Sequence, residues 1–193
     1  MTRETTALEF VPPMKVLDWK ASSGMTYRCK TWNSIQDVDS DDWNDLKRGP
    51  HDIFMDIRFI CAIEKGTAEE SQFRYLIFYD EQDHPVASCC LSSVFSYYQL
   101  DSSMQKEGWR RRCVDFVNRF APSIMHGTIV LCGLPISGVG SQLQFAGTVR
   151  RPDILQQLDE TIRSFARELK AESVSLKEFT QKECGELEHL AVL

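Results

Sequence analysis

The segment TIVLCGLPISGVGSQLQFAG, residues 128–147, joins a continuous apolar run to a long glycine-rich loop. The run Thr128–Leu134 is typical of a strand that is buried on both faces of a sheet. Beyond the loop, Pro152 and Asp153 suit the first turn of a helix. One helical face then carries Ile154, Leu155, Leu158, Ile162, Phe165, Ala166 and Leu169. Because SVSLKEF (173–179) alternates like a strand, we expect a strand, helix, strand unit with a right-handed crossover.

Other strands are expected upstream of this unit. FRYLIFYD (73–80) is rich in strand-forming residues, and VASCCLSSVFSYY (86–98) is a second such run. EQDHP lies between them and has turn chemistry, so the two runs predict an antiparallel hairpin. The segment Met25–Trp32 alternates with a period of two and is expected to be the first strand.

Helices are expected between and after these strands. Ser40 or Asp41 is expected to cap a short helix that runs to Lys47 and stops at Gly49. Residues 52–65 have helical apolar spacing and predict a second helix. Residues 104–122 predict an amphipathic helix, and residues 181–193 predict a short helix at the end of the chain.

The expected fold class is α/β (α+β), with a central mixed, largely antiparallel sheet flanked by helices. The chain has 193 residues, of which 42% are hydrophobic and 26% charged, which suits one core. We therefore expect a single domain over residues 1–193, with residues 1–24 as an extended N-terminal segment.

The net charge is -6 and the pI is about 5.3, so we expect no bulk nucleic-acid binding. The N-terminus lacks a basic start followed by an apolar stretch, and no apolar run approaches the roughly 20 residues of a membrane span. A cytoplasmic protein is expected.

The chain has seven cysteines, an odd number, and their spacing is irregular. Cys89 and Cys90 are adjacent in an apolar run. This pattern indicates buried, reduced thiols rather than a disulfide framework. The chain has no Cys-x-x-Cys pair, and its four histidines are far apart in sequence, so no metal site is predicted.

The glycine loop is expected to lie at the carboxyl end of a buried strand and to face a helix N-terminus. Unpaired backbone N–H groups at such a place favour an anionic group such as a pyrophosphate. Gly138 and Gly140 would let the backbone approach a ligand closely. The loop has neither the Gly-Lys-Ser/Thr of a Walker loop nor Gly-x-Gly-x-x-Gly, and a purely structural loop remains an alternative.

The strand order, together with FRYLIFYDEQDHPVASCCL, SVSLKEF and the loop ahead of Pro152, resembles the GNAT acyl-CoA N-acyltransferase superfamily. The resemblance is strongest to the divergent branch that includes the Fem-type aminoacyltransferases and predicted N-acyltransferases. It covers about Asp41 to Phe179 and is one of pattern and order. It implies a GNAT-like fold that binds acyl-CoA or acetyl-CoA.

In that superfamily the strand equivalent to TIVLCGL pairs its backbone with the pantetheine arm, and the following loop receives the pyrophosphate. Gln144 and Gly147 match the first two anchors of the loop motif Gln/Arg-x-x-Gly-x-Gly/Ala, whereas Val149 departs from the third. Arg150 and Arg151 are expected to meet the nucleotide phosphates. The resemblance implies these cofactor-binding residues: Leu131, Cys132, Gly133, Leu134, Ser137, Gly138, Val139, Gly140, Gln144 and Gly147.

Transfer of an acyl group to an amine needs a base for the ammonium proton and donors for the oxyanion. Glu178, on the strand beside the expected cleft, and His126, ahead of the buried strand, are the candidate bases. A surface role for Glu178 is the alternative. Cys132 has no histidine beside it in sequence and is expected to be a buried thiol.

The superfamily's sheet continues past the equivalent of SVSLKEF and often brings a tyrosine that protonates the leaving thiolate. This sequence has no tyrosine after Tyr98, so we expect a truncated version or a homodimer whose second copy completes the sheet. Two functions remain open. The first is an N-acyltransferase that uses a small-molecule acyl or aminoacyl donor and an amine acceptor. The second is an inactive GNAT-like domain for protein or ligand binding.

Overall fold

The computed structural model describes residues 14–47, 49, 52–97, 126–136, 142–147, 149–177, 179 and 185. The helix expected at 104–122 and nearly all of the helix expected at 181–193 lie outside these ranges. Residues 1–13 of the expected extended segment also lie outside them. All statements below concern the described residues.

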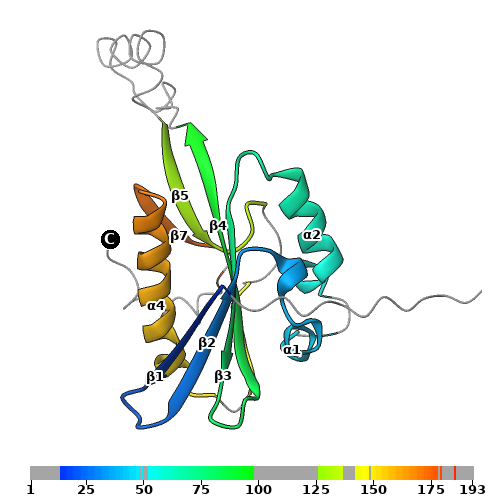
Figure 1. Ribbon diagram of the computed structural model, residues 1–193. Coiled ribbons are helices and arrows are strands. Elements are labelled where there is room, and N and C mark those ends of the chain that lie inside the picture. The colour runs from blue at the N-terminus through cyan, green and yellow to red at the C-terminus, as the bar shows by residue number, and fades with distance from the viewer. Residues whose placement is uncertain are drawn as a thin grey trace, which may run out of the picture.

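The described strands form one sheet of seven strands, in the order β1-β2-β3-β4-β5-β7, with β6 paired to β4 (Figure 1). The strands are β1 (Lys15–Lys20), β2 (Thr26–Trp32), β3 (Phe73–Tyr79), β4 (Pro85–Tyr97), β5 (His126–Cys132), β6 (Gln144–Phe145) and β7 (Ser173–Leu176). Of the described pairs, only β5 and β7 run parallel. The predicted class, a mixed and largely antiparallel sheet flanked by helices, is confirmed.

Three α-helices are described, and they cover both faces of the sheet (Figure 1). They are α1 (Ser40–Asp45), α2 (Ile57–Gly66) and α4 (Arg151–Glu168), with short 3-10 turns at Ile35–Asp37 and Ile53–Met55. The crossover from β5 through α4 to the parallel strand β7 is the strand, helix, strand unit that the sequence predicts. Among the described residues, no helix combines the length and the apolar character that a bilayer-spanning segment needs.

Two predicted helices have different starts in the structure. Asp39, rather than Ser40 or Asp41, caps α1, because its carboxylate accepts the backbone N–H groups of the next turn. The helix expected over residues 52–65 is divided at Asp56, which is extended and whose carboxylate accepts the N–H of Arg58. The capping side chain therefore starts α2 at Ile57.

The strands also differ from the prediction at several ends. The expected first strand, Met25–Trp32, is the second, because Lys15–Lys20 pairs with it as β1. The expected strand Thr128–Leu134 ends as β5 at Cys132, where Gly133 turns away with φ +139° and donates its N–H to Cys90 O at 2.8 Å. The loop after β5 contributes β6, which the sequence did not predict.

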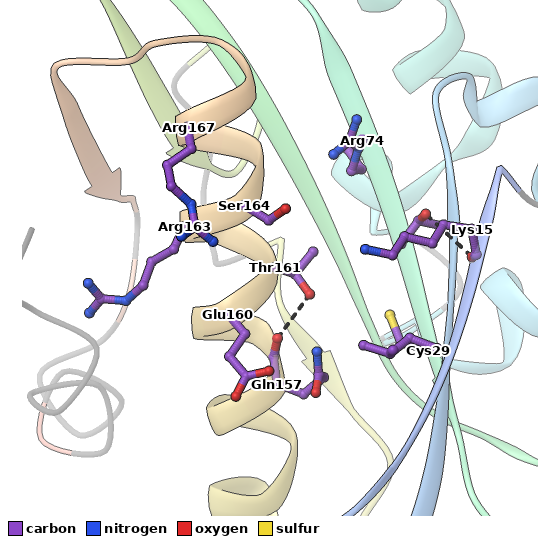
Figure 2. A pocket seen from close by; sticks show the side chains of 11 residues that line it. Lys15, Cys29, Arg74, Gln157, Glu160, Thr161, Arg163, Ser164 and Arg167 are labelled. Carbon is purple, nitrogen blue, oxygen red and sulfur yellow. Dashed lines mark hydrogen bonds between the residues drawn. The ribbon is translucent and has the colours of Figure 1, made fainter.

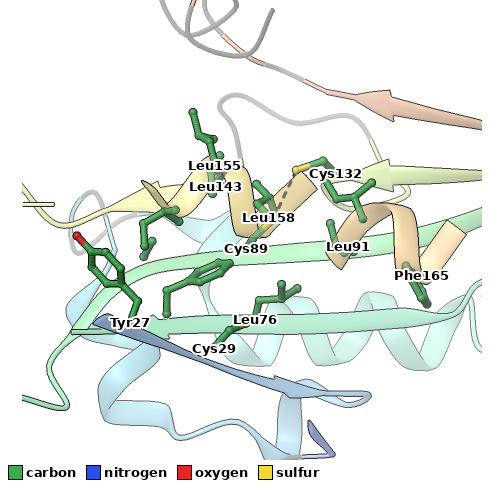
Figure 3. Close-up of a cluster of buried hydrophobic side chains, with 14 of the residues drawn as sticks. Tyr27, Cys29, Leu76, Cys89, Leu91, Cys132, Leu143, Leu155, Leu158 and Phe165 are labelled. Carbon is green, nitrogen blue, oxygen red and sulfur yellow. Dashed lines mark hydrogen bonds between the residues drawn. The ribbon is translucent and has the colours of Figure 1, made fainter. Parts of the chain in front are cut away.

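The core has one cluster on each face of the sheet. Between the sheet and α4, one cluster includes Leu76 of β3 with Leu158 and Phe165 of α4 (Figure 3). Phe78 of β3 belongs to the same cluster, and none of these four side chains is more than 1% exposed. On the other face, α1 and α2 pack on alternate residues of the same strands. The sheet is thus a middle layer, with α4 on one face and α1 and α2 on the other.

Candidate functional site

The candidate site lies where the chain leaves β5 and later enters α4. β5 and β7 are paired in parallel from Ile129↔Ser173 to Cys132↔Leu176. The site is therefore at the carboxyl end of the parallel pair, the usual ligand position in such crossovers.

Gly133 ends β5 with both of its backbone groups in use. Its N–H bonds to Cys90 O, and its carbonyl accepts the hydroxyl hydrogen of the buried Ser92 at 2.6 Å. With φ +139°, this residue adopts a backbone conformation that favours glycine. The glycine therefore fixes the direction in which the loop leaves the sheet.

Lys177, just after β7, holds the outgoing loop. Its ammonium group donates to the carbonyl of Leu134 at 3.1 Å and to that of Ile136 at 2.9 Å. Its backbone N–H also reaches Cys132 O at 3.4 Å, so the two strands stay paired to their ends. The protein itself thus uses several backbone groups that a ligand lying along β5 would need.

A group of buried polar side chains lies on and next to β6. Gln142 is 3% exposed, and its Oε1 atom has no hydrogen-bond partner. Ser88 of β4 is fully buried, its Oγ also has no partner, and it pairs in register with the buried Gln144. A buried polar atom without a partner costs about 1–3 kcal/mol, so such atoms commonly mark a bound water or ligand group.

The start of α4 already faces a carboxylate of the protein. Asp153, 3% exposed in the first turn, accepts the hydroxyl hydrogen of Ser23 from the β1–β2 turn. Burial, followed by the charge of Asp153, raises the pKa of the nearby Tyr27. The buried carboxylate of Asp153 therefore partly compensates the positive end of the α4 dipole.

Positive charge lies on the outer side of the same turn. Arg150 precedes the first residue of α4 and is exposed, and the guanidinium of Arg151 lies 5.0 Å from the centre of the Phe145 ring. Phe145 belongs to β6, so this contact ties the loop to the helix start. An anionic group could approach from this side.

Cys132 is buried between the sheet and α4. Its sulfur lies 3.5 Å from that of Cys89 (Figure 3). The hydrogen bond to Cys132, together with burial, raises the pKa of Cys89 well above its ordinary value. The described cysteines form no disulfide, and the raised pKa keeps Cys89 a neutral thiol rather than a nucleophilic thiolate.

The structure brings together some of the residues predicted for the site. Leu131, Cys132, Gly133, Leu134 and Gln144 lie at the ends of β5 and β6, and all but Gly147 of the described cofactor-binding residues are buried. Gly147 is exposed in the loop ahead of α4. Ser137, Gly138, Val139, Gly140 and Glu178 lie outside the described residues.

His126 is the first residue of β5, at the opposite end of the strand from the loop. At about 3.3 Å per residue, the strand places its backbone roughly 20 Å from that of Cys132. The structure therefore does not bring His126 to the other candidate residues, and its role as a base stays a prediction.

The sequence reasoning missed Lys177 and Ser92. Their contacts with the loop join strands that are distant in the chain, and no local pattern predicts them. The polar face of β7, where Ser173, Ser175 and Lys177 alternate with apolar residues, was the signal that could have drawn attention to Lys177. Among the described residues, no group of three or more His, Cys, Asp or Glu side chains could hold a metal ion.

The fold and these contacts define a mixed α/β protein with a parallel strand pair at one edge of an otherwise antiparallel sheet. No protein-family model matches the chain, and no curated protein matches it. Two crystal structures are similar to it, and both are variants of the BH1408 protein from Bacillus halodurans. A point mutant is 14% identical over 93% of each chain with a TM-score of 0.48. A tetramutant is 15% identical over 91% of this chain and 90% of its own, with a TM-score of 0.45. At these identities and TM-scores, no residue role is assigned to this chain from the BH1408 structures.

Proposed function

We propose that the protein is an N-acyltransferase that moves an acyl or aminoacyl group from acyl-CoA or a charged carrier to an amine. The resemblance to the GNAT superfamily supports the proposal, because the β5–α4–β7 crossover follows an antiparallel hairpin as the resemblance requires. The donor would lie at the end of β5 and extend toward the start of α4.

The observation that carries the proposal is the amide oxygen of Gln142, which is buried and has no hydrogen-bond partner among the described residues, in the segment after β5 where the donor is expected. Pantetheine contains amide N–H groups, and one of these would satisfy that oxygen. Arg150, exposed just ahead of α4, would meet a phosphate at the other end of the donor.

In the proposed reaction the amine nitrogen attacks the thioester carbonyl carbon. The carbon–sulfur bond then breaks, the thiolate leaves and takes up a proton, and the amine loses one. A base near the end of β7, where Glu178 stands in sequence, would accept the amine proton. Backbone N–H groups at the start of the loop would stabilise the oxyanion.

A second candidate function is an inactive domain that keeps this sheet and binds another protein or a different ligand. It is favoured by Lys177, whose ammonium group occupies the carbonyls of Leu134 and Ile136, and by the close pairing of β5 with β7. Asp153 at the inner side of α4 also disfavours a second anion there.

Calorimetry and thermal shift with CoA, acetyl-CoA and a long-chain acyl-CoA would separate the two functions. A ligand at 100 times its Kd stabilises the native state by about 2.7 kcal/mol, or roughly 5–11 °C for a domain of this size. Arg150→Ala should weaken CoA binding about tenfold, as the loss of a charge-assisted contact predicts. Arg58→Ala is the matched control, because Arg58 is exposed on α2 at the other face of the sheet.

Release of free thiol from acetyl-CoA in the presence of an amine panel would then test transfer itself. Binding with no thiol release from any donor would favour the inactive domain. No binding of any CoA ester would refute the proposed donor site.

A further inference from the structure

A cleft lies between α4 and the strands β1, β2 and β3, away from the candidate site at the end of β5. It is about 340 Å³ in volume and is formed by α4 together with β1, β2 and β3 (Figure 2). This volume is at the lower end of the range for small-molecule sites. The cleft is therefore large enough for a small ligand only.

Polar groups from distant parts of the chain converge on this cleft. In Figure 2, Gln157, Thr161 and Ser164 of α4 face Lys15 of β1 and Cys29 of β2 across the gap. Thr161 Oγ1 donates to the backbone carbonyl of Gln157 at 2.9 Å, so its hydroxyl oxygen remains free to accept. The groups left to donate include the Lys15 ammonium, the Gln157 amide, the Ser164 hydroxyl, the Arg167 guanidinium and Nε of Arg74.

Gln157 is the strongest sign of a ligand. The residue is 4% exposed and points into the cleft, yet in the described part of the chain its side-chain amide makes no hydrogen bond. That amide is therefore available to donate to, and accept from, a ligand that lies in the cleft.

The charges around the cleft leave an excess of one positive charge. Arg74 is held by Glu168 through two bonds of 3.0 and 3.1 Å, and Arg163 is held by Asp159 at 2.9 Å. In the described chain, the lining charges without an ion-pair partner are those of Lys15, Arg167 and Glu160, which are two positive and one negative.

The floor of the cleft is apolar and uncharged. Leu17 of β1 and Cys29 of β2 line it. Burial raises the pKa of Cys29 to about 12, while the charge of Lys15 acts in the opposite direction. Its thiol is therefore neutral at physiological pH and does not repel an anion.

We propose that this cleft binds a small organic monoanion, a carboxylate with a short hydrocarbon chain. The carboxylate accepts from Lys15, Gln157 and Ser164, and the hydrocarbon lies against Leu17 and Cys29. A phosphate dianion fits less well, because Arg74 and Arg163 are already paired with carboxylates and the unpaired lining charges leave an excess of only one positive charge. The inference does not depend on the acyltransferase proposal.

Titration of the 15N-labelled full chain with sodium hexanoate would test it by NMR. Sodium phosphate and sodium chloride at equal ionic strength are the comparison salts. We expect hexanoate to shift the amide signals of Lys15, Leu17, Gln157 and Ser164 along a saturable curve, with no comparable change along α2. Chloride should not shift them.

Lys15→Ala should weaken hexanoate binding about tenfold, the effect of losing one hydrogen bond to a charged group. Lys20→Ala is the matched control, because it removes an exposed lysine from the other end of β1. Gln157→Leu should weaken binding as well and keeps a side chain of similar size. Equal affinities of the two lysine variants, no saturable shift with hexanoate, or tighter binding of phosphate than of hexanoate would each overturn the proposal.

Discussion

Replacing Gly133 with alanine tests the turn that ends β5. An added Cβ would lie 3.7 Å from Lys177 Cβ and 3.9 Å from Gln142 Cγ, both of which are ordinary contacts. Steric overlap therefore contributes little, and the cost comes from holding a side-chain-bearing residue at φ +139°. Such conformations cost about 1–3 kcal/mol, so the free energy of unfolding of Gly133→Ala should fall by this amount.

The measurement is urea unfolding followed by tryptophan fluorescence. With an m-value of about 2 kcal/mol/M, the midpoint should fall by about 0.5–1.5 M. Gly147→Ala is the control, because Gly147 is exposed, has open space around its Cβ position and has no left-handed φ. Its unfolding free energy should change by less than about 0.5 kcal/mol. Equal midpoints for the two variants would show that the turn at Gly133 does not impose this strain.

Three further predictions concern the core, a helix cap and the response to alkali. Leu158→Ala should lower the unfolding free energy by about 2–5 kcal/mol in urea titrations, because Leu158 is fully buried against the sheet. Asp56→Ala should lower it by about 1 kcal/mol through loss of the α2 cap, which circular dichroism melts would detect; an unchanged melt would contradict the cap. Burial raises the pKa of Cys29 from 9.0 to about 12. The neutral thiol therefore contributes fully to the free energy of unfolding below pH 9, and this contribution is lost as the pH rises toward 12. Urea midpoints measured from pH 8 to 11 should therefore fall less steeply for Cys29→Ala than for the wild type, and parallel curves would contradict this assignment.

The β5–α4–β7 crossover was predictable because its signals are local. The apolar run of β5, Pro152 at the helix start and the apolar stripe of α4 all lie within one continuous stretch. The β3–β4 hairpin was predictable for the same reason, since both strands are strongly apolar and are joined by turn residues.

β1 was missed because it is an edge strand. Five of its six residues are exposed, so burial imposes no alternation on KVLDWK that a pattern could reveal. β6 has two residues and depends on pairing with β4, a partner far away in sequence. The break at Asp56 was missed because apolar spacing continues through it, whereas the capping bond depends on backbone conformation.

Only the location of the candidate site could be predicted from the sequence. The glycine loop and the helix start could be located from sequence, but the residues that shape them could not. Lys177 reaches the carbonyls of Leu134 and Ile136 from another part of the chain, and no local pattern predicts that Gln142 is buried. The cleft beside α4 combines Lys15 with Gln157, which are brought together by the sheet and not by any sequence pattern.

The bond between Ser23 and Asp153 joins positions separated by 130 residues. During synthesis on the ribosome, the N-terminal hairpin emerges long before the helix that secures its turn. At about 5–20 residues per second, the nascent chain waits several seconds or more for that helix. During this interval the apolar face of the hairpin, which includes Tyr27 and Cys29, lacks the cover that α4 later provides.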